Sequence, residues 1–197
     1  MKYEIHHSYN YTKVELFIRD EPVMVILVVY LCNMKRIYLV RHAKSSWSNF
    51  NLNDYERPLN DRGKKDAPEM AERLKALISG NPMLISSTAV RAFETASIFS
   101  GILQSAKLEK SDRLYHASDD TILDVIREMN EGKDVAMIFC HNPGITEFVN
   151  RMEGVFIDNV PTCSILAMDS SAKAWKDVSF SSLSLNFYLF PKMEDNA

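Results

Sequence analysis

RIYLVRH, at residues 36–42, gives the strongest indication of fold class in this 197-residue chain. The run at residues 36–40 is short, contains β-branched and aromatic residues and, after Arg36, is apolar on both faces, which is typical of a buried parallel strand. A second run of this kind, VAMIFC, occupies residues 135–140 and is followed directly by His141. Two buried strands so far apart in the sequence favour an α/β fold, because parallel strands need long crossover connections.

The segments around these two strands alternate between helical and strand patterns. Apolar residues at helical spacing predict helices at residues 61–79, 88–103, 119–130 and 144–152. Shorter apolar runs predict further strands at residues 83–86, 106–111, 164–168 and 183–189. This alternation predicts a three-layer α/β/α sandwich with a mostly parallel central sheet, formed by a domain over residues 34–197.

Residues 1–33 stand apart from this pattern. Their apolar run, VMVILVVYLC at residues 23–32, is shorter than the roughly 18 residues that a membrane-spanning helix needs. It reads either as an extra edge strand or as part of an extension upstream of the natural start, Met34. We expect an extension without function, so that a chain beginning at Met34 folds and acts like the full chain.

The composition narrows the function classes. A net charge of −3 gives no basic field for a nucleic acid, and we expect neither a nucleic-acid nor a membrane partner. The three cysteines, Cys32, Cys140 and Cys163, are too scattered for a disulfide framework or a zinc site. No carboxylate cluster suits magnesium. We therefore expect a reduced, cytoplasmic protein that uses no metal and no cofactor; its oligomeric state is left open.

Basic side chains gather where the predicted strands end. Arg41 and His42 end the first strand, His141 ends the strand at residues 135–140, and Arg91 lies in the first turn of the helix after residues 83–86. Parallel strands bring these ends to one edge of the sheet, where ligands of such sheets bind. No acidic residue stands beside any of them in the sequence, so the cluster predicts a bound anion. Phosphate suits the arginine fork.

Each of these residues also has a structural interpretation on its own. A strand-end histidine is more often a loop residue with a satisfied hydrogen bond, and Arg91 alone reads as a solvated helix residue. Tyr115 and His116 read as loop packing. The coincidence of basic residues at three strand ends is what favours chemistry over packing.

Four ordered motifs resemble the histidine phosphatase superfamily, which has the phosphoglycerate mutase-like fold. LVRHA at residues 39–43 resembles the Arg-His-Gly signature, with Ala43 in place of the glycine. RPLNDRG at 57–63, SSTAVRAFETA at 86–96 and HNPG at 141–144 resemble the SixA-type phosphohistidine phosphatases. The resemblance covers about residues 34–193.

The resemblance implies a role for each matched residue. His42 would be the nucleophile, Arg41 and Arg91 would hold the phosphoryl oxygens, and His141 would hydrogen-bond them. Arg57 would be a further residue of the substrate-binding pocket.

Larger members of the superfamily protonate the leaving oxygen with a glutamate that has no convincing equivalent here. The only candidates for a general acid are Asp119, Asp120 and Glu69. A missing acid favours phosphohistidine, because imidazole leaves more easily than an alkoxide.

The mechanism we expect has two in-line steps. Neutral His42 attacks phosphorus while its other ring nitrogen donates to a backbone carbonyl, and water then hydrolyses phospho-His42. Arg41, Arg91 and a protonated His141 stabilise the oxygens. The expected partner is a phosphate-bearing substrate such as a histidine-phosphotransfer protein. As an alternative, the chain is a phosphomonoesterase that acts on a small phosphorylated metabolite. A second alternative is a non-catalytic phosphate- or phosphoprotein-binding module.

Overall fold

A six-stranded mixed sheet forms the centre of the protein. The computed structural model describes residues 34–78, 80–105 and 107–191, so the expectations for residues 1–33 lie outside the described residues. The strand order is β3-β2-β4-β1-β5-β6. The first four strands in this order pair in parallel, and the pairs β1–β5 and β5–β6 are antiparallel. The strands are β1 (Lys35–Arg41), β2 (Met83–Ser87), β3 (Leu108–Ser111), β4 (Val135–Cys140), β5 (Ile165–Ser170) and β6 (Leu183–Leu189).

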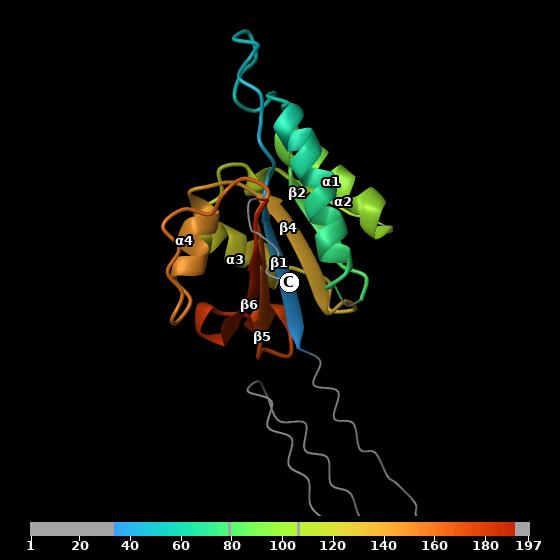
Figure 1. The fold of residues 1–197 in the computed structure, drawn as a ribbon. Coiled ribbons are helices and arrows are strands. Elements are labelled where there is room, and N and C mark those ends of the chain that lie inside the picture. Colours follow the sequence, from blue (N-terminus) through green and yellow to red (C-terminus); the bar gives the residue numbers. More distant parts are fainter. Residues whose placement is uncertain (1–33, 79, 106, 192–197) are drawn as a thin grey trace, which may run out of the picture. The chain divides into compact units, whose positions relative to one another are not determined.

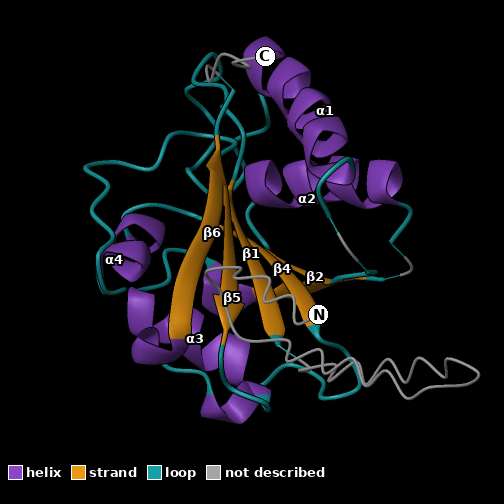
Figure 2. Cartoon of the chain, turned by 60° about the horizontal axis from the view of Figure 1, so that its bottom comes forward, coloured by secondary structure: helices purple, strands orange, loops and turns teal. Residues whose placement is uncertain are grey.

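Helices cover both faces of this sheet, as Figures 1 and 2 show. The helices are α1 (Asp61–Lys75), α2 (Val90–Leu103), α3 (Asp119–Arg127) and α4 (Gly144–Asn150), and short 3₁₀ turns occupy Asp112–Leu114, Trp175–Asp177 and Phe180–Ser182. The α1 and α2 helices pack on one face, and α3 and α4 on the other. The predicted three-layer α/β/α fold is therefore confirmed.

The first helix is shorter than its sequence pattern predicts. It begins where the side chain of Asn60 caps the amide of Gly63. It ends at Lys75 rather than at residue 79, because the amides of Leu77 and Ile78 both donate to the carbonyl of Leu74 and tighten the last turn. The apolar residues beyond Lys75 continue the helical pattern without continuing the helix.

The position of strand β1 explains why residues 37–40 are apolar on both faces. Its side chains alternate between the two layers of the core. Ile37 and Leu39 pack into the cluster under α3 and α4, whereas Tyr38 and Val40 pack into the cluster under α1 and α2. All four are fully buried, so β1 contributes to both cores at once and is held at the centre of the fold.

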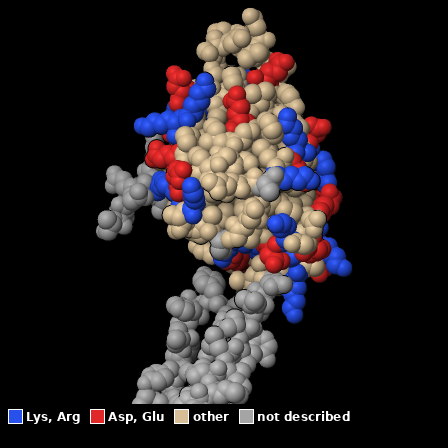
Figure 3. Space-filling model, turned by 90° about the vertical axis from the view of Figure 1, so that its right-hand side faces the viewer, with Lys and Arg blue, Asp and Glu red and all other residues tan. Residues whose placement is uncertain are grey.

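The surface over α1 and α2 carries charges of both signs. Lysine and arginine side chains are interspersed with aspartate and glutamate around an uncharged patch in Figure 3. None of the helices in the described ranges is both long enough and apolar enough to cross a bilayer.

Candidate active site

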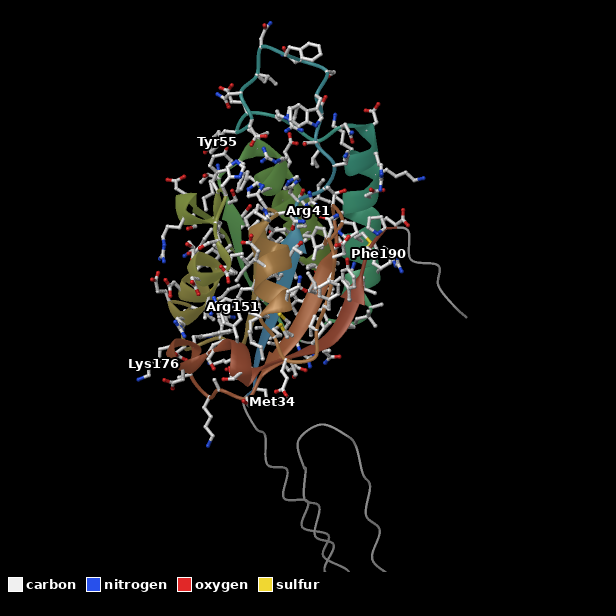
Figure 4. The ribbon with its side chains drawn as sticks, turned by 90° about the vertical axis from the view of Figure 1, so that its left-hand side faces the viewer. Met34, Arg41, Tyr55, Arg151, Lys176 and Phe190 are labelled. Atoms are coloured by element: carbon white, nitrogen blue, oxygen red, sulfur yellow. The ribbon has the colours of Figure 1, made fainter. Side chains whose placement is uncertain are left out.

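The predicted basic residues meet at the carboxyl edge of the parallel strands. Arg41 pairs in register with Cys140, and the amide of His42 donates to the carbonyl of Cys140 at 3.2 Å. The two strand-end histidines, His42 and His141, are therefore neighbours, with ring centroids 4.9 Å apart. Figure 4 shows Arg41 at the end of β1 remote from Met34, on the side where the loop with Tyr55 lies.

His42 is buried and neutral, with a defined tautomer. Its Nδ1 lies 2.8 Å from the carbonyl oxygen of Ala43, and the Nε of Arg91 donates to its Nε2 at 3.2 Å. Nδ1 therefore carries the proton and Nε2 carries the lone pair. Burial, followed by the charges of Arg91, Arg41 and Arg57, lowers the pKa of His42 from 6.5 to about 3. A neutral imidazole that carries a lone pair on the nitrogen facing the site is the nucleophilic form of histidine.

Ala43, the residue that replaces the signature glycine, fits its position. It is fully buried, and its amide donates to the hydroxyl of Thr95 at 3.0 Å. Among the described residues, the non-glycine positions with a positive φ are Gln104, His116 and Cys163. The backbone at Ala43 therefore does not need the conformation that favours glycine.

His141 is also a neutral ring, and its protonation beside a phosphoryl group stays a prediction. Its Nδ1 lies 3.3 Å from the Nη2 of Arg91, a group that can only donate, so its Nε2–H donates to the hydroxyl of Ser87 at 2.8 Å. Burial, then His42, Arg91 and His116, lower the pKa of His141 to about 2. A charged ring is disfavoured because it would face a guanidinium and a second imidazole inside the protein.

Asp54 is the residue that the sequence did not reveal. Its carboxylate accepts hydrogen bonds from the Nη2 of Arg91 at 2.9 Å and from the Nη1 of Arg57 at 2.8 Å. The expectation that no acid lies beside the basic residues is therefore wrong in space, although it is true in sequence. Despite partial burial, the charge of Arg91 and these hydrogen bonds lower the pKa of Asp54 to about 2. One ionised carboxylate thus holds two guanidiniums together.

Arg41 keeps an unsatisfied donor at the site. Its Nη1 donates to the carbonyl of Val160, but its buried Nε has no hydrogen-bond partner among the residues that the structure describes. Burial, and to a smaller extent the charge of Arg91, lower the pKa of this guanidinium from its ordinary value. Such a buried donor is costly unless a ligand accepts from it.

Arg57 braces the loop that leads away from His42. Its Nε donates to the carbonyl of Ser46 and its Nη2 to the hydroxyl of Ser45, while Trp47 stacks on the guanidinium with 3.1 Å between Cζ and the ring centroid. Together with the bond to Asp54, these contacts engage all three nitrogens. The charge of Arg57 acts on His42, and its contact with a phosphoryl group stays a prediction.

The three acids named from the sequence are not among these contacts. Asp119 and Asp120, at the start of α3, both pair with Arg151 on α4, at 2.8 and 2.5 Å. The hydrogen bond from Arg151 lowers the pKa of Asp119, which makes it a poor proton donor. Glu69 is exposed on α1. The structure therefore offers no support for these residues as general acids.

Tyr115 and His116 do lie beside the other site residues. The hydroxyl of Tyr115 donates to the Oδ2 of Asp54 at 3.1 Å, and the Nε2 of His116 lies 3.4 Å from the same oxygen. The rings of both residues face His141, with centroid distances of 5.7 and 5.8 Å. The sequence-based interpretation of Tyr115 and His116 as loop packing misses their place at the site. Their contact partner, Asp54, is 61 residues away from Tyr115 in the sequence.

Across the described ranges, no three or more His, Cys, Asp or Glu side chains are grouped as a metal-binding set.

Comparison with known proteins finds a similarity to the family that the sequence motifs resemble. Residues 37–118 match the family model of the histidine phosphatase superfamily, branch 1. A chloroplastic protein of Arabidopsis thaliana, itself uncharacterized, is 27% identical over 154 residues, which are 73% of this chain and 70% of that one.

Solved structures share the fold. A structure assigned to the phosphohistidine phosphatase SixA of Agrobacterium tumefaciens superposes with a TM-score of 0.69 and 24% identity, over 80% of this chain and 98% of that one. A mycobacterial glucosyl-3-phosphoglycerate phosphatase gives a TM-score of 0.56 and 12% identity, over 78% and 97%. The matched segment includes the Arg-His pair that ends β1, and the two solved structures share the fold of the chain: over residues 37–118 the chain is similar to the histidine phosphatase superfamily, branch 1.

Proposed function

We propose that this phosphatase hydrolyses phosphohistidine on a protein partner through a phospho-His42 intermediate. The observation that carries the proposal is the state of His42. Its Nδ1 proton is held by the carbonyl of Ala43, and its Nε2 lone pair faces Arg91 at the sheet edge. A fixed tautomer with the lone pair on the outer nitrogen is what an attack on phosphorus requires.

In the first step, the Nε2 of His42 forms a bond to phosphorus as the bond from phosphorus to the substrate nitrogen breaks. Because Nδ1 keeps its proton, His42 becomes a phosphoimidazolium. A substrate that carries a proton on its far ring nitrogen leaves as neutral imidazole. The phosphoryl group thus passes between two groups of the same kind, so the step needs neither a cofactor nor a net proton.

In the second step, water attacks phosphorus and the bond to Nε2 breaks. His42 leaves as neutral imidazole, since the carbonyl of Ala43 has kept the proton on Nδ1 throughout. The water proton goes to the departing phosphate or to solvent. The same backbone hydrogen bond therefore supports both attack and release.

The arginines supply the charge stabilisation in both steps. The unpartnered Nε of Arg41 would donate to a phosphoryl oxygen, and Arg91 already bridges the two histidine rings at 3.2 and 3.3 Å. A dianionic phosphoryl group between these residues would also favour a proton on His141. Donors that are oriented before the reaction stabilise the charge of the transition state most effectively.

Two further observations support a protein-bound substrate. The connections that border the site, residues 42–60 and 112–118, form no additional domain over the strand ends. The SixA structure from Agrobacterium tumefaciens also superposes with a higher TM-score than the glucosyl-3-phosphoglycerate phosphatase. An uncovered site would admit a side chain of a partner, such as a histidine-phosphotransfer protein.

A phosphomonoesterase is the second candidate, and one observation favours it. His116 and the carboxylate of Asp54 lie together at the site, where a proton donor for an alkoxide would be needed. The absence of a general acid is the sequence-based argument for a phosphohistidine substrate, and this pair of residues weakens that argument.

The test compares phosphate release from a phosphohistidine-bearing protein and from p-nitrophenyl phosphate, in the wild type and in His42→Ala. We expect faster release from the protein and no turnover in the variant, which should still gain thermal stability from added phosphate. A wild type that prefers the small ester would support the phosphomonoesterase. Undiminished turnover in His42→Ala would exclude the nucleophile, and binding without any turnover would indicate the non-catalytic module.

A further inference from the structure

His116 occupies an unusual position for a solvent-accessible loop residue. It lies between β3 and α3 with a φ of 50°, a left-handed conformation that residues other than glycine seldom adopt. Its side chain is 54% exposed, yet its Nε2 lies 3.4 Å from the Oδ2 of Asp54. Backbone conformations of this kind are concentrated at functional sites, where the surroundings hold them in place.

The surroundings of His116 fix the ring at the edge of the site. The ring of Tyr115 lies 4.3 Å from it between centroids, and the ring of His141 lies 5.8 Å away. Arg91 is the remaining charged group of this cluster, and it pairs with the same Asp54 oxygen. His116 therefore lies beside both an ionised carboxylate and His141, one of the two histidines of the site.

The backbone that follows His116 is held as well. The carbonyl oxygen of Ala117 lies so close to Gly144 that a Cβ at that position would collide with it. Gly144 begins α4, three residues after His141. The loop with His116 is thus pressed against the start of the helix that follows the second site histidine.

We propose that His116 is the group that donates a proton to the leaving oxygen of a phosphate ester and recovers one from water, with Asp54 as its positioning residue. The proposal rests on the phospho-His42 pathway. Imidazole is the side chain suited to this exchange, because it takes up and releases protons near neutral pH. Since Nε2 is engaged with Asp54, Nδ1 is the nitrogen left to exchange the proton.

The proton balance closes over the two steps. For a phosphate ester, the bond from phosphorus to the leaving oxygen breaks as the Nε2 of His42 bonds to phosphorus, and the proton on His116 passes to that oxygen. In the second step, water bonds to phosphorus, the bond to His42 breaks, and the proton of the water passes to His116. His116 ends protonated, as it began, and the substrate class extends to phosphate esters with poor leaving groups.

The experiment compares how kcat/KM depends on the acidity of the leaving group in the wild type and in a His116 variant. Asparagine tolerates the left-handed conformation, so His116→Asn removes the imidazole and keeps the backbone. We expect kcat/KM for phenyl phosphate, which needs a proton on its phenolate, to fall by roughly 10²–10⁴-fold. The value for p-nitrophenyl phosphate, whose leaving group is far more acidic, should change little. Arg113→Gln, a surface variant in the same segment, should leave both values unchanged.

An equal loss on both substrates would indicate a structural role and overturn the proposal, as would no loss on either. A second measurement avoids the variant altogether: the wild type should show a solvent deuterium isotope effect on kcat/KM for phenyl phosphate, and its absence would also contradict proton donation. If the wild type releases phosphate in a His42-dependent manner from a phosphohistidine-bearing protein but from neither ester, the role of His116 is overturned and the phospho-His42 pathway stands. If it does so from none of the three substrates, the phospho-His42 pathway itself fails.

Discussion

Asp54 is the residue on which the arrangement of the site depends most. Its two carboxylate oxygens accept from Arg57 and Arg91, and the second oxygen also meets Tyr115 and His116. Four side chains from three segments of the chain therefore share one anionic partner. Although Asp54 reacts with nothing in the proposed mechanism, it determines where the groups that do react are placed.

Replacing Asp54 by asparagine should disorganise this cluster. An amide offers one acceptor oxygen, so its NH₂ group would face the donors of Arg91 or Arg57. Because displacements of about 1 Å can cost roughly 10²-fold in rate, we expect kcat/KM for p-nitrophenyl phosphate to fall by about that factor in Asp54→Asn. Steady-state kinetics of purified variants would measure it.

Asp120→Asn is the matched control, since Asp120 also pairs with an arginine but on the surface between α3 and α4. It should retain wild-type kinetics. Equal losses in the two variants, or full activity in Asp54→Asn, would contradict the organising role of Asp54.

At the scale of elements, the sequence predicted the parts of the site that strands carry. The apolar runs of β1 and β4 locate both strands, and parallel pairing then places His42 beside His141. Asp54 could not be found in this way, because it lies within the long connection between β1 and α1, whose path no periodicity encodes. The end of α1 was missed for a related reason: Leu77 and Ile78 continue the apolar pattern while their amides close a turn.

The contact between α4 and the loop before α3 gives a prediction at this scale. Gly144→Ala would drive a methyl group into the carbonyl of Ala117 and displace the loop that carries His116. Overpacking of this kind costs about 1–3 kcal/mol, so we expect a loss of that size in the free energy of unfolding, together with reduced activity. Urea denaturation and kinetics would measure the two effects.

Gly101→Ala is the control for adding a methyl group to a helix where it collides with nothing. Gly101 lies within α2, and a Cβ there would meet nothing within 4 Å. Alanine is the better helix former, so this variant should be neutral or more stable by up to about 1 kcal/mol. If Gly144→Ala behaves like Gly101→Ala, the close packing of α4 against residue 117 does not constrain the loop.

At the scale of the whole molecule, the site makes folding depend on pH. The pKa of His42 is lowered to about 3 and that of His141 to about 2, from an ordinary value of 6.5. Above pH 6.5 both rings are neutral in the folded and the unfolded chain, and the pH dependence from this source vanishes. Below pH 6.5 these two histidines bind protons in the unfolded chain but stay neutral in the folded chain, so the free energy of unfolding falls as the pH decreases towards 3.

The free energy of unfolding should therefore decrease between pH 7 and pH 4 by up to about 1.4 kcal/mol per pH unit for each of the two histidines. Asp54, with a pKa lowered from 3.8 to about 2, acts in the same direction but only below this range. Urea denaturation in phosphate-free buffer would measure the slope, and the double variant His42→Gln, His141→Gln should flatten it. An equal slope in the wild type and the double variant would show that the pH dependence arises elsewhere. A flatter slope in the double variant would mean that the neutral state of these histidines lowers the stability of the protein in acid. The nucleophilic imidazole lies among three arginines and must stay unprotonated to react, so the folded chain cannot bind the protons that the unfolded chain binds.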